Sequence, residues 1–124
     1  MKRMRSLIVV LLAAGMLVLA QAASADDSHT APSPADPVAG AAVFHQTCVV
    51  CHASNGRGTM PGMPDFTRAD GVLALPTAEL TSRITHGFYD GKAPMAMPVK
   101  GDNPNLTQGD IRNVIAYMRS RFWH

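Results

Sequence analysis

Cys48-Val49-Val50-Cys51-His52 is the stretch of the sequence that decides the fold. The pattern Cys-x-x-Cys-His is typical of the covalent attachment of a c-type haem. Two thiols at this spacing fall on one side of a helical turn, where they can add to the two vinyl groups of haem. The adjacent histidine then supplies an imidazole nitrogen as an axial ligand of the iron. We therefore expect one covalently bound haem c, held by Cys48 and Cys51, with His52 as its proximal ligand.

The same pair of cysteines has competing interpretations. A Cys-x-x-Cys pair also occurs in redox dithiols, in zinc sites and in small disulfide loops. Zinc would need two more ligands in a compatible cluster, and a thioredoxin-like site would need a βαβ context, which the sequence around the motif does not show. The remaining histidines are scattered along the chain: His29, His45, His86 and His124. Haem attachment is the favoured interpretation, with a metal site or a disulfide as the alternatives.

The first residues of the chain have the pattern of a secretory signal peptide. A cationic start at residues 1–5 precedes an apolar run over residues 7–20, and residues 23–25 read Ala-Ser-Ala, a small-x-small cleavage pattern. The apolar run is shorter than the roughly 20 residues that a spanning helix needs. We expect cleavage after Ala25, a periplasmic location and no stable membrane insertion, with an uncleaved membrane anchor as the alternative.

Size and charge narrow the class of protein. Cleavage would leave 99 of the 124 residues, which is enough for one domain. Three of the 11 basic residues lie in the expected signal peptide, so eight basic residues face 9 acidic ones and the formal charge is −1. No basic stripe remains to support nucleic acid binding. A core of this size is marginal alone, and a buried haem would supply much of the missing apolar contact.

Helix signals flank the cysteine motif and recur after it. Asp36-Pro37 is a favourable helix start, with Asp as the N-cap and Pro at the first helical position, and predicts a helix that ends at about Cys48. Residues 77–86 predict a second helix, because apolar positions fall on one face and Gly87 provides a C-terminal cap.

The last helix has the clearest signals. Thr107 can cap it, and Asp110 follows three residues later near the positive end of the helix dipole. Apolar residues then recur at helical spacing. Residues 53–59 and 89–105 are rich in glycine, proline and other turn residues, and predict loops. With no strand alternation, the sequence predicts an all-α fold of three to five short helices, with long loops wrapped around one haem.

A six-coordinate electron carrier needs a ligand on the second face of its haem. Met95 and Met97 lie in a Pro-rich, non-helical segment, and thioether sulfur favours Fe(II), which raises the potential. We favour Met97 as the distal ligand because Pro98 fixes the backbone beside it, with Met95 as the main alternative. The further alternatives are Met60, Met63 and, for a bis-histidine site, His86.

The chain resembles the small bacterial class I c-type cytochromes over residues 36–123. The shared parts are Gly40-x-x-x-Phe44, the Cys-x-x-Cys-His motif, Met97-Pro98, and Leu106-Thr107-x-x-Asp110-Ile111 leading to Ala116-Tyr117. The resemblance implies the cytochrome c fold, in which the first and last helices cross closely. It places Gly40 at the crossing, with Phe44 and Tyr117 packed beside it.

The same resemblance implies a site. His52 and a loop methionine would be the iron ligands, and a carbonyl within residues 60–64 would accept a hydrogen bond from the His52 ring. The chain departs from the pattern after Met97-Pro98, where many relatives have a small residue and an aromatic one. We divide the chain into a signal peptide (residues 1–25), a disordered leader (26–35) and a cytochrome c domain (36–124).

These features predict an electron carrier rather than an enzyme. The iron would cycle between Fe(II) and Fe(III), either in a free periplasmic carrier or in the cytochrome subunit of a periplasmic dehydrogenase or respiratory chain. Its partners would be redox proteins: a periplasmic dehydrogenase, a reductase or a terminal oxidase. One alternative is a haem protein with an open sixth coordination site, for gas binding or a peroxidase-like reaction. A Cu(I)-binding protein that uses the methionines is another, but it leaves the Cys-x-x-Cys-His motif unexplained.

Overall fold

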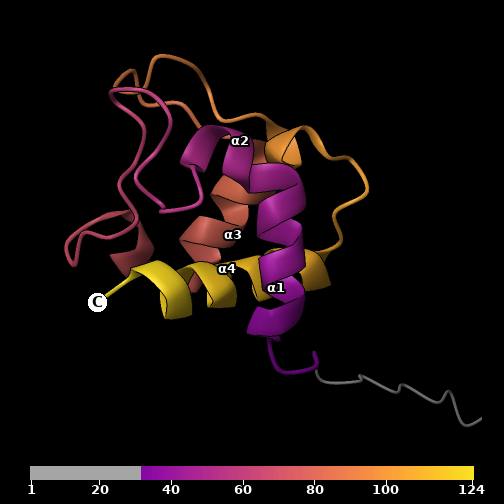
Figure 1. The fold of residues 1–124 in the computed structure, drawn as a ribbon. Helices are drawn as coiled ribbons and strands as arrows, with labels where there is room; N and C mark the ends of the chain where they lie inside the picture. Colours follow the sequence, from indigo (N-terminus) through magenta and orange to yellow (C-terminus); the bar gives the residue numbers. More distant parts are fainter. Residues whose placement is uncertain (1–31) are drawn as a thin grey trace, which may run out of the picture. The chain divides into compact units, whose positions relative to one another are not determined.

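Helices carry the fold in the computed structural model, which describes residues 32–124. In chain order they are α1 (Pro37–Val43), η1 (Phe44–Cys48), α2 (Val49–His52), η2 (Val72–Ala74), α3 (Thr77–His86), η3 (Val99–Asp102) and α4 (Gln108–Phe122), as Figure 1 shows. Over these residues the β-type pairing consists of one isolated antiparallel bridge, between Phe88 and Met97. The predicted all-α architecture of short helices and long loops is confirmed.

The first helical segment begins as the sequence predicts. The side chain of Asp36 accepts hydrogen bonds from the backbone N–H groups of Val38 at 2.8 Å and Ala39 at 3.3 Å. The segment then runs through α1, η1 and α2 to His52, four residues beyond the expected end at Cys48. The reason is η1, a wider π-type turn that continues the helix instead of ending it. As a result, the whole Cys-x-x-Cys-His motif lies on helical backbone.

α1 crosses α4 at a glycine. Gly40 is buried, and a Cβ atom there would overlap the backbone carbonyl of Asn113 and lie 2.9 Å from the Cβ of Tyr117. The ring centroids of Phe44 and Tyr117 are 5.4 Å apart beside the crossing. The close crossing expected from Gly40, Phe44 and Tyr117 is therefore confirmed.

The other two long helices also have the predicted ends. The Thr107 hydroxyl accepts a hydrogen bond from the Asp110 N–H at 3.1 Å, and the Asp110 carboxylate accepts one from the Thr107 N–H at 2.9 Å. This reciprocal arrangement is a capping box, and it fixes the start of α4. α3 ends at His86, and Gly87 follows with a φ of 78°. Two short turns, η2 and η3, lie in stretches that the sequence predicted only as loops.

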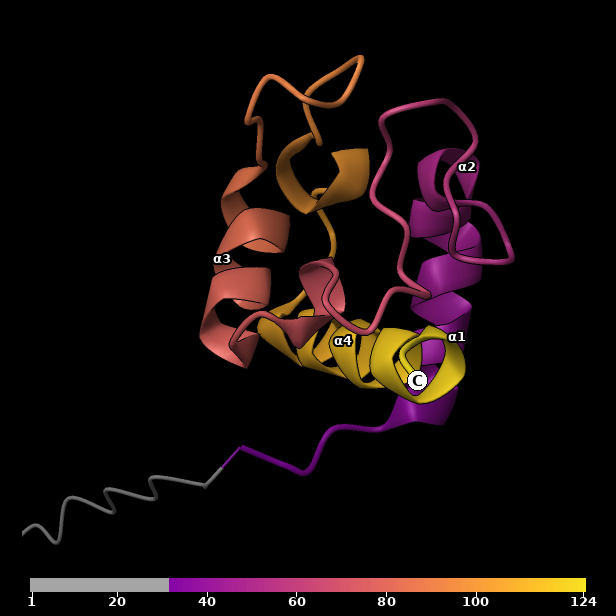
Figure 2. The same cartoon turned by 90° about the vertical axis from the view of Figure 1, so that its left-hand side faces the viewer.

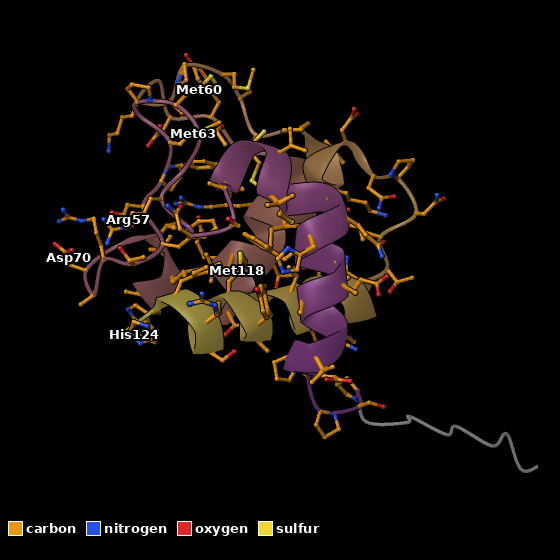
Figure 3. All side chains as sticks on the ribbon, in the orientation of Figure 1. Arg57, Met60, Met63, Asp70, Met118 and His124 are labelled. Atoms are coloured by element: carbon orange, nitrogen blue, oxygen red, sulfur yellow. The ribbon has the colours of Figure 1, made fainter. Side chains whose placement is uncertain are left out.

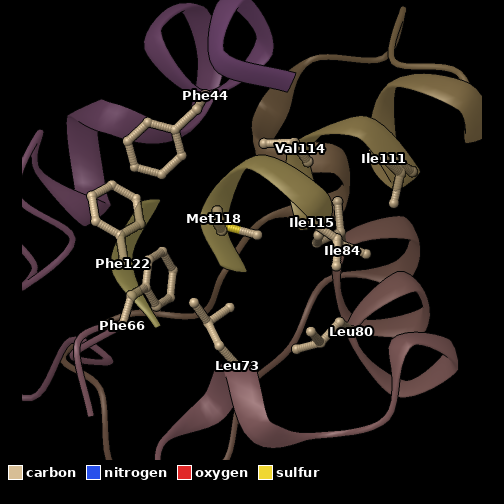
Figure 4. Close-up of a cluster of buried hydrophobic side chains, with 10 residues drawn as sticks. All are labelled: Phe44, Phe66, Leu73, Leu80, Ile84, Ile111, Val114, Ile115, Met118 and Phe122. Carbon is tan, nitrogen blue, oxygen red and sulfur yellow. The ribbon is translucent and has the colours of Figure 1, made fainter. Parts of the chain in front are cut away.

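The hydrophobic core is built on α4. Figure 2 shows α4 beneath both other parts of the fold, with α3 on one side and α1–α2 on the other. The buried side chains of the core come from η1, the loop after α2, η2, α3 and α4 (Figure 4): Phe44, Phe66, Leu73, Leu80, Ile84, Ile111, Val114, Ile115, Met118 and Phe122. α4 therefore positions the two walls of the candidate site relative to each other.

Part of the predicted organisation lies outside the described residues. These parts are the expected signal peptide, residues 1–25, and residues 26–31 of the expected leader. Among residues 32–124, no helix combines the length and the apolar character that crossing a membrane requires.

Candidate haem site

A cavity of about 490 Å³ opens beside the cysteine motif. Its size falls within the range of roughly 300–1,000 Å³ typical of cofactor and ligand sites. Much of its wall is apolar and continuous with the core, including Phe66, Leu73, Leu80, Ile84 and Met118. A flat, largely apolar group would bury its surface against such a lining.

The motif residues Cys48, Cys51 and His52 all line this cavity. Cys48 closes η1, and Cys51 and His52 form the end of α2, which terminates at Ala53, where φ is 58°. The loop that follows folds back onto the helix end: the Thr59 N–H donates to the Cys51 carbonyl, and the Gly58 N–H to the His52 carbonyl, each at 3.0 Å. The carbonyl groups that a helix end leaves without partners are thereby satisfied.

The Cys48 thiol does not have the lowered pKa of a reactive dithiol. Both cysteines are free. Burial, and then the neighbouring Cys51, raises the pKa of the Cys48 thiol to about 11, whereas reactive dithiols need a lowered pKa. Within residues 32–124 there is also no group of three or more His, Cys, Asp or Glu side chains that could hold a metal ion.

The His52 imidazole is in its neutral form, the form that can bind a metal ion. Burial lowers the pKa of His52 to about 4, so the ring is neutral near pH 7 and keeps a free nitrogen lone pair. Its Nδ1 atom is buried and has no hydrogen-bond partner among the described residues. The expected acceptor, a carbonyl of residues 60–64, is therefore not in place. The neutral imidazole, the two thiols and the largely apolar cavity that they line together fit a haem-bearing site.

One aromatic residue that the sequence did not single out supports His52. Phe66 stacks on the imidazole, with ring centroids 4.6 Å apart and planes 24° apart. The Phe66 N–H donates to the Gly56 carbonyl at 2.7 Å, which ties this residue to the loop after α2. No local pattern identifies such a contact, because the two residues meet only when the loop folds back.

The methionines differ in how they relate to the cavity. Met97 lines it, is partly buried and packs against the core. Met95 lines it too but is 49% exposed, and Met60 is 40% exposed. Figure 3 shows Met60 and Met63 in the loop after α2, away from Met118 on α4. Of the two methionines in the loop before η3, Met97 is therefore the more buried.

Two further methionines also contribute thioethers to the cavity wall. They are Met63 and the core residue Met118, which no sequence pattern marked as a ligand. His86, the bis-histidine alternative, is exposed at the end of α3, where its Nδ1 lies 3.1 Å from the Ser82 carbonyl.

The segment that carries Met97 is fixed through its backbone. The Phe88 N–H donates to the Met97 carbonyl at 3.0 Å, and the Met97 N–H donates to the Phe88 carbonyl at 2.8 Å. In Figure 2 this segment, which connects α3 to η3, lies on the α3 side of the molecule, and α2 lies on the opposite side. The cavity is thus lined by His52 from one part of the fold and by Met97 from another.

Comparison with known proteins places the chain among haem proteins. The family described as cytochrome C oxidase, cbb3-type, subunit III matches residues 35–118. Cytochrome c-555 of Chlorobaculum thiosulfatiphilum is 32% identical over 83 residues, which are 67% of this chain and 93% of that protein.

Two longer proteins are also similar. The cbb3-type cytochrome c oxidase subunit CcoP of Rhodobacter capsulatus is 31% identical over 91 residues, which are 70% of this chain. Lupanine 17-hydroxylase [cytochrome c] of a Pseudomonas species is 28% identical over 93 residues, which are 74% of this chain. The match spans 31% of the oxidase subunit and 12% of the hydroxylase.

Proposed function

Because this chain belongs to the c-type cytochrome family, whose members carry covalently attached haem c, we propose that it is a periplasmic one-electron carrier with a single haem. The observation that carries the proposal is the convergence of Cys48, Cys51, His52 and Met97 on one largely apolar cavity. When bound there, haem supplies the Fe(II)/Fe(III) couple.

Each residue of the site has a distinct part in this proposal. Cys48 and Cys51 hold the haem as thioethers, which makes the attachment permanent. His52 offers a neutral imidazole nitrogen from the end of α2. Met97 offers a soft sulfur atom, which prefers Fe(II) over Fe(III) and so raises the potential. The largely apolar lining would cover the faces of the haem and remove them from water.

The proposal includes a location and a class of partner. Two of the relatives are named as a cbb3-type oxidase subunit and as a hydroxylase [cytochrome c]. We propose that the partner of this chain is likewise a redox protein: a periplasmic dehydrogenase, a reductase or a terminal oxidase. The chain itself would make no bond in a substrate.

Redox titration of the matured protein, together with CO addition, tests the carrier function. A carrier with both axial positions filled should take up one electron per chain in a single Nernstian step, and the reduced protein should not bind CO. Rapid CO binding to the reduced protein at neutral pH would instead indicate an open sixth position, and with it gas binding or a peroxidase-like reaction.

A further inference from the structure

The turn after α3 brings two backbone segments unusually close. Gly87 has a φ of 78°, in the left-handed region that favours glycine. A Cβ atom on Gly87 would lie 2.8 Å from the Met97 carbonyl oxygen and 3.2 Å from the Val99 nitrogen. Glycine is therefore required here twice, for the backbone conformation and for the space.

This approach aligns Phe88 with Met97. Their two backbone hydrogen bonds, 3.0 and 2.8 Å long, use both the N–H and the carbonyl of Met97. The next residue, Pro98, has a φ of −70°, which its ring restricts. The backbone of Met97 is thus held on both of its polar groups and stiffened immediately afterwards.

Phe88 is held in turn by α3. The guanidinium carbon of Arg83 lies 3.7 Å above the centre of the Phe88 ring, and the Arg83 Nε atom is 2.7 Å from the Glu79 carboxylate. α3 itself is anchored in the core by Leu80 and Ile84. A continuous line of contacts therefore connects the core, through α3 and Phe88, to the backbone of Met97.

We propose that Gly87 and Phe88 are positioning residues for the Met97 thioether, and that they set how easily an external ligand displaces this sulfur from ferric haem iron. The inference rests on Met97 being the distal ligand in the proposed function. A thioether is a soft, uncharged ligand and binds Fe(III) weakly. Its occupancy of the ferric site then depends on how firmly the backbone holds it within reach of the iron.

The chain offers a matched pair of glycines to test this role. Gly91 lies in the same loop with a φ of 79°, but a Cβ atom there meets nothing within 4 Å. Gly87→Ala and Gly91→Ala both place a side chain at a positive φ, but only the first brings a Cβ atom against the Met97 carbonyl. Both are made in the matured, haem-bearing protein.

Two measurements on the ferric protein report on the thioether bond. One is the pH at which alkali abolishes the weak charge-transfer band of the thioether–Fe(III) bond at the red end of the visible spectrum. The other is the affinity for imidazole, which displaces the sulfur. In Gly87→Ala the band should be lost at lower pH, and imidazole should bind about tenfold more tightly. The net free energy of one hydrogen bond corresponds to about a tenfold change in an equilibrium constant. Gly91→Ala should match the wild type in both measurements.

Equal shifts in the two glycine variants would overturn the inference, since the approach of residue 87 to Met97 would then make no difference. The absence of a shift in Gly87→Ala would also overturn it. If Gly87→Ala does not accumulate as holoprotein, Arg83→Lys decides, because it keeps a positive charge beside the cavity but removes the planar guanidinium that lies over Phe88. The pH at which the band is lost should fall in this variant as well, by a smaller amount than in Gly87→Ala. An unchanged pH of band loss would overturn the inference.

Two controls are needed. One distinguishes the positioning of the sulfur from a general loss of stability, and the other tests whether Met97 is the distal ligand at all. If Gly87 only stabilises the fold, Gly87→Ala should lower the unfolding midpoint of the ferrous and ferric proteins alike. The pH at which the band is lost should then stay unchanged. Met97→Ala in the parent protein distinguishes the two proposals: a band that survives it refutes Met97 as the ligand, whereas a band that it removes leaves the Gly87 result to decide the inference alone.

Discussion

Phe66 lies nearly parallel to the imidazole of His52, at a centroid distance of 4.6 Å. A flat contact of this kind restricts rotation of the imidazole about its bond to Cβ. The hydrogen bond expected to fix the ring, from Nδ1 to a carbonyl of residues 60–64, is not formed in this structure. The aromatic face is therefore the contact that orients the ring of His52, the proposed proximal ligand.

Phe66→Leu should disturb the orientation of His52 more than it disturbs the fold. The substitution keeps an apolar side chain but removes the flat face, and should cost about 1–2 kcal/mol of unfolding free energy. The haem methyl signals in the NMR spectrum of the ferric protein depend on the imidazole plane, and they should change their order. Phe44→Leu is the matched control, since Phe44 is also buried but packs on Tyr117. The same rearrangement in both variants would contradict the role of Phe66.

Gly40→Val should destabilise the protein by about 1–3 kcal/mol or more, the usual range for overpacking. The upper end is expected because the new side chain meets the backbone carbonyl of Asn113, which cannot rotate away as a side chain can. Ala42→Val is the control, because Ala42 is exposed on the same helix. Chemical denaturation measures both variants, and equal midpoints would show that the crossing tolerates a larger residue.

Acid stability should depend on the cap of α4. Hydrogen bonds from the backbone N–H and then the hydroxyl of Thr107 hold the pKa of Asp110 below its ordinary value of 3.8. The Asp110 carboxylate binds a proton less readily in the folded state than in the unfolded state. Its contribution to stability is therefore complete above the unfolded-state pKa and is lost as the pH falls through the folded-state pKa. Asp110→Asn should flatten this part of the stability curve.

Substitutions at Thr107 provide the control for the cap. Thr107→Ser keeps the hydroxyl and should preserve the wild-type acid dependence, whereas Thr107→Ala should cost about 1 kcal/mol at neutral pH. Denaturant unfolding between neutral and strongly acidic pH measures these curves. If the unfolding free energy of Asp110→Asn changes with pH in parallel with that of the wild type, Asp110 is not the source of the acid dependence.

Local signals made much of the fold predictable. Asp36-Pro37 and the pair Thr107 and Asp110 act within one turn of their own helix, so their patterns are visible in the sequence and their hydrogen bonds are found in the structure. The crossing at Gly40 was expected from a resemblance, and the structure supplies the steric reason for it.

Features that depend on distant partners were not predictable in the same way. η3 contains Lys100 and Gly101 at φ values of 53° and 62°, and the turn is tied to the first helical segment when Asn103 donates to the Thr47 hydroxyl at 3.2 Å. No residue pattern within the turn encodes that partner. The sequence also left Met95 and Met97 as alternatives, and the difference in their burial arises only when the loop pairs with Phe88.

Covalent attachment should require the two cysteines. The double variant Cys48→Ala, Cys51→Ala should lose the haem-dependent peroxidase stain on a denaturing gel, because no thioether remains to hold haem in an unfolded chain. Val50→Ala lies inside the motif, but Val50 is 74% exposed, so this variant should keep the stain. Stain that persists in the double variant would refute attachment at this motif.

The axial pair His52 and Met97 is the central claim, and the absorption spectrum of the oxidised protein tests it most directly. The wild type should show the thioether–Fe(III) charge-transfer band, Met97→Ala should lose it, and Met95→Ala should keep it. The potential should fall in Met97→Ala, since axial ligands move haem potentials over a range of about 0.8 V. Loss of the band in Met95→Ala but not in Met97→Ala, or a wild type that lacks the band altogether, would contradict the account.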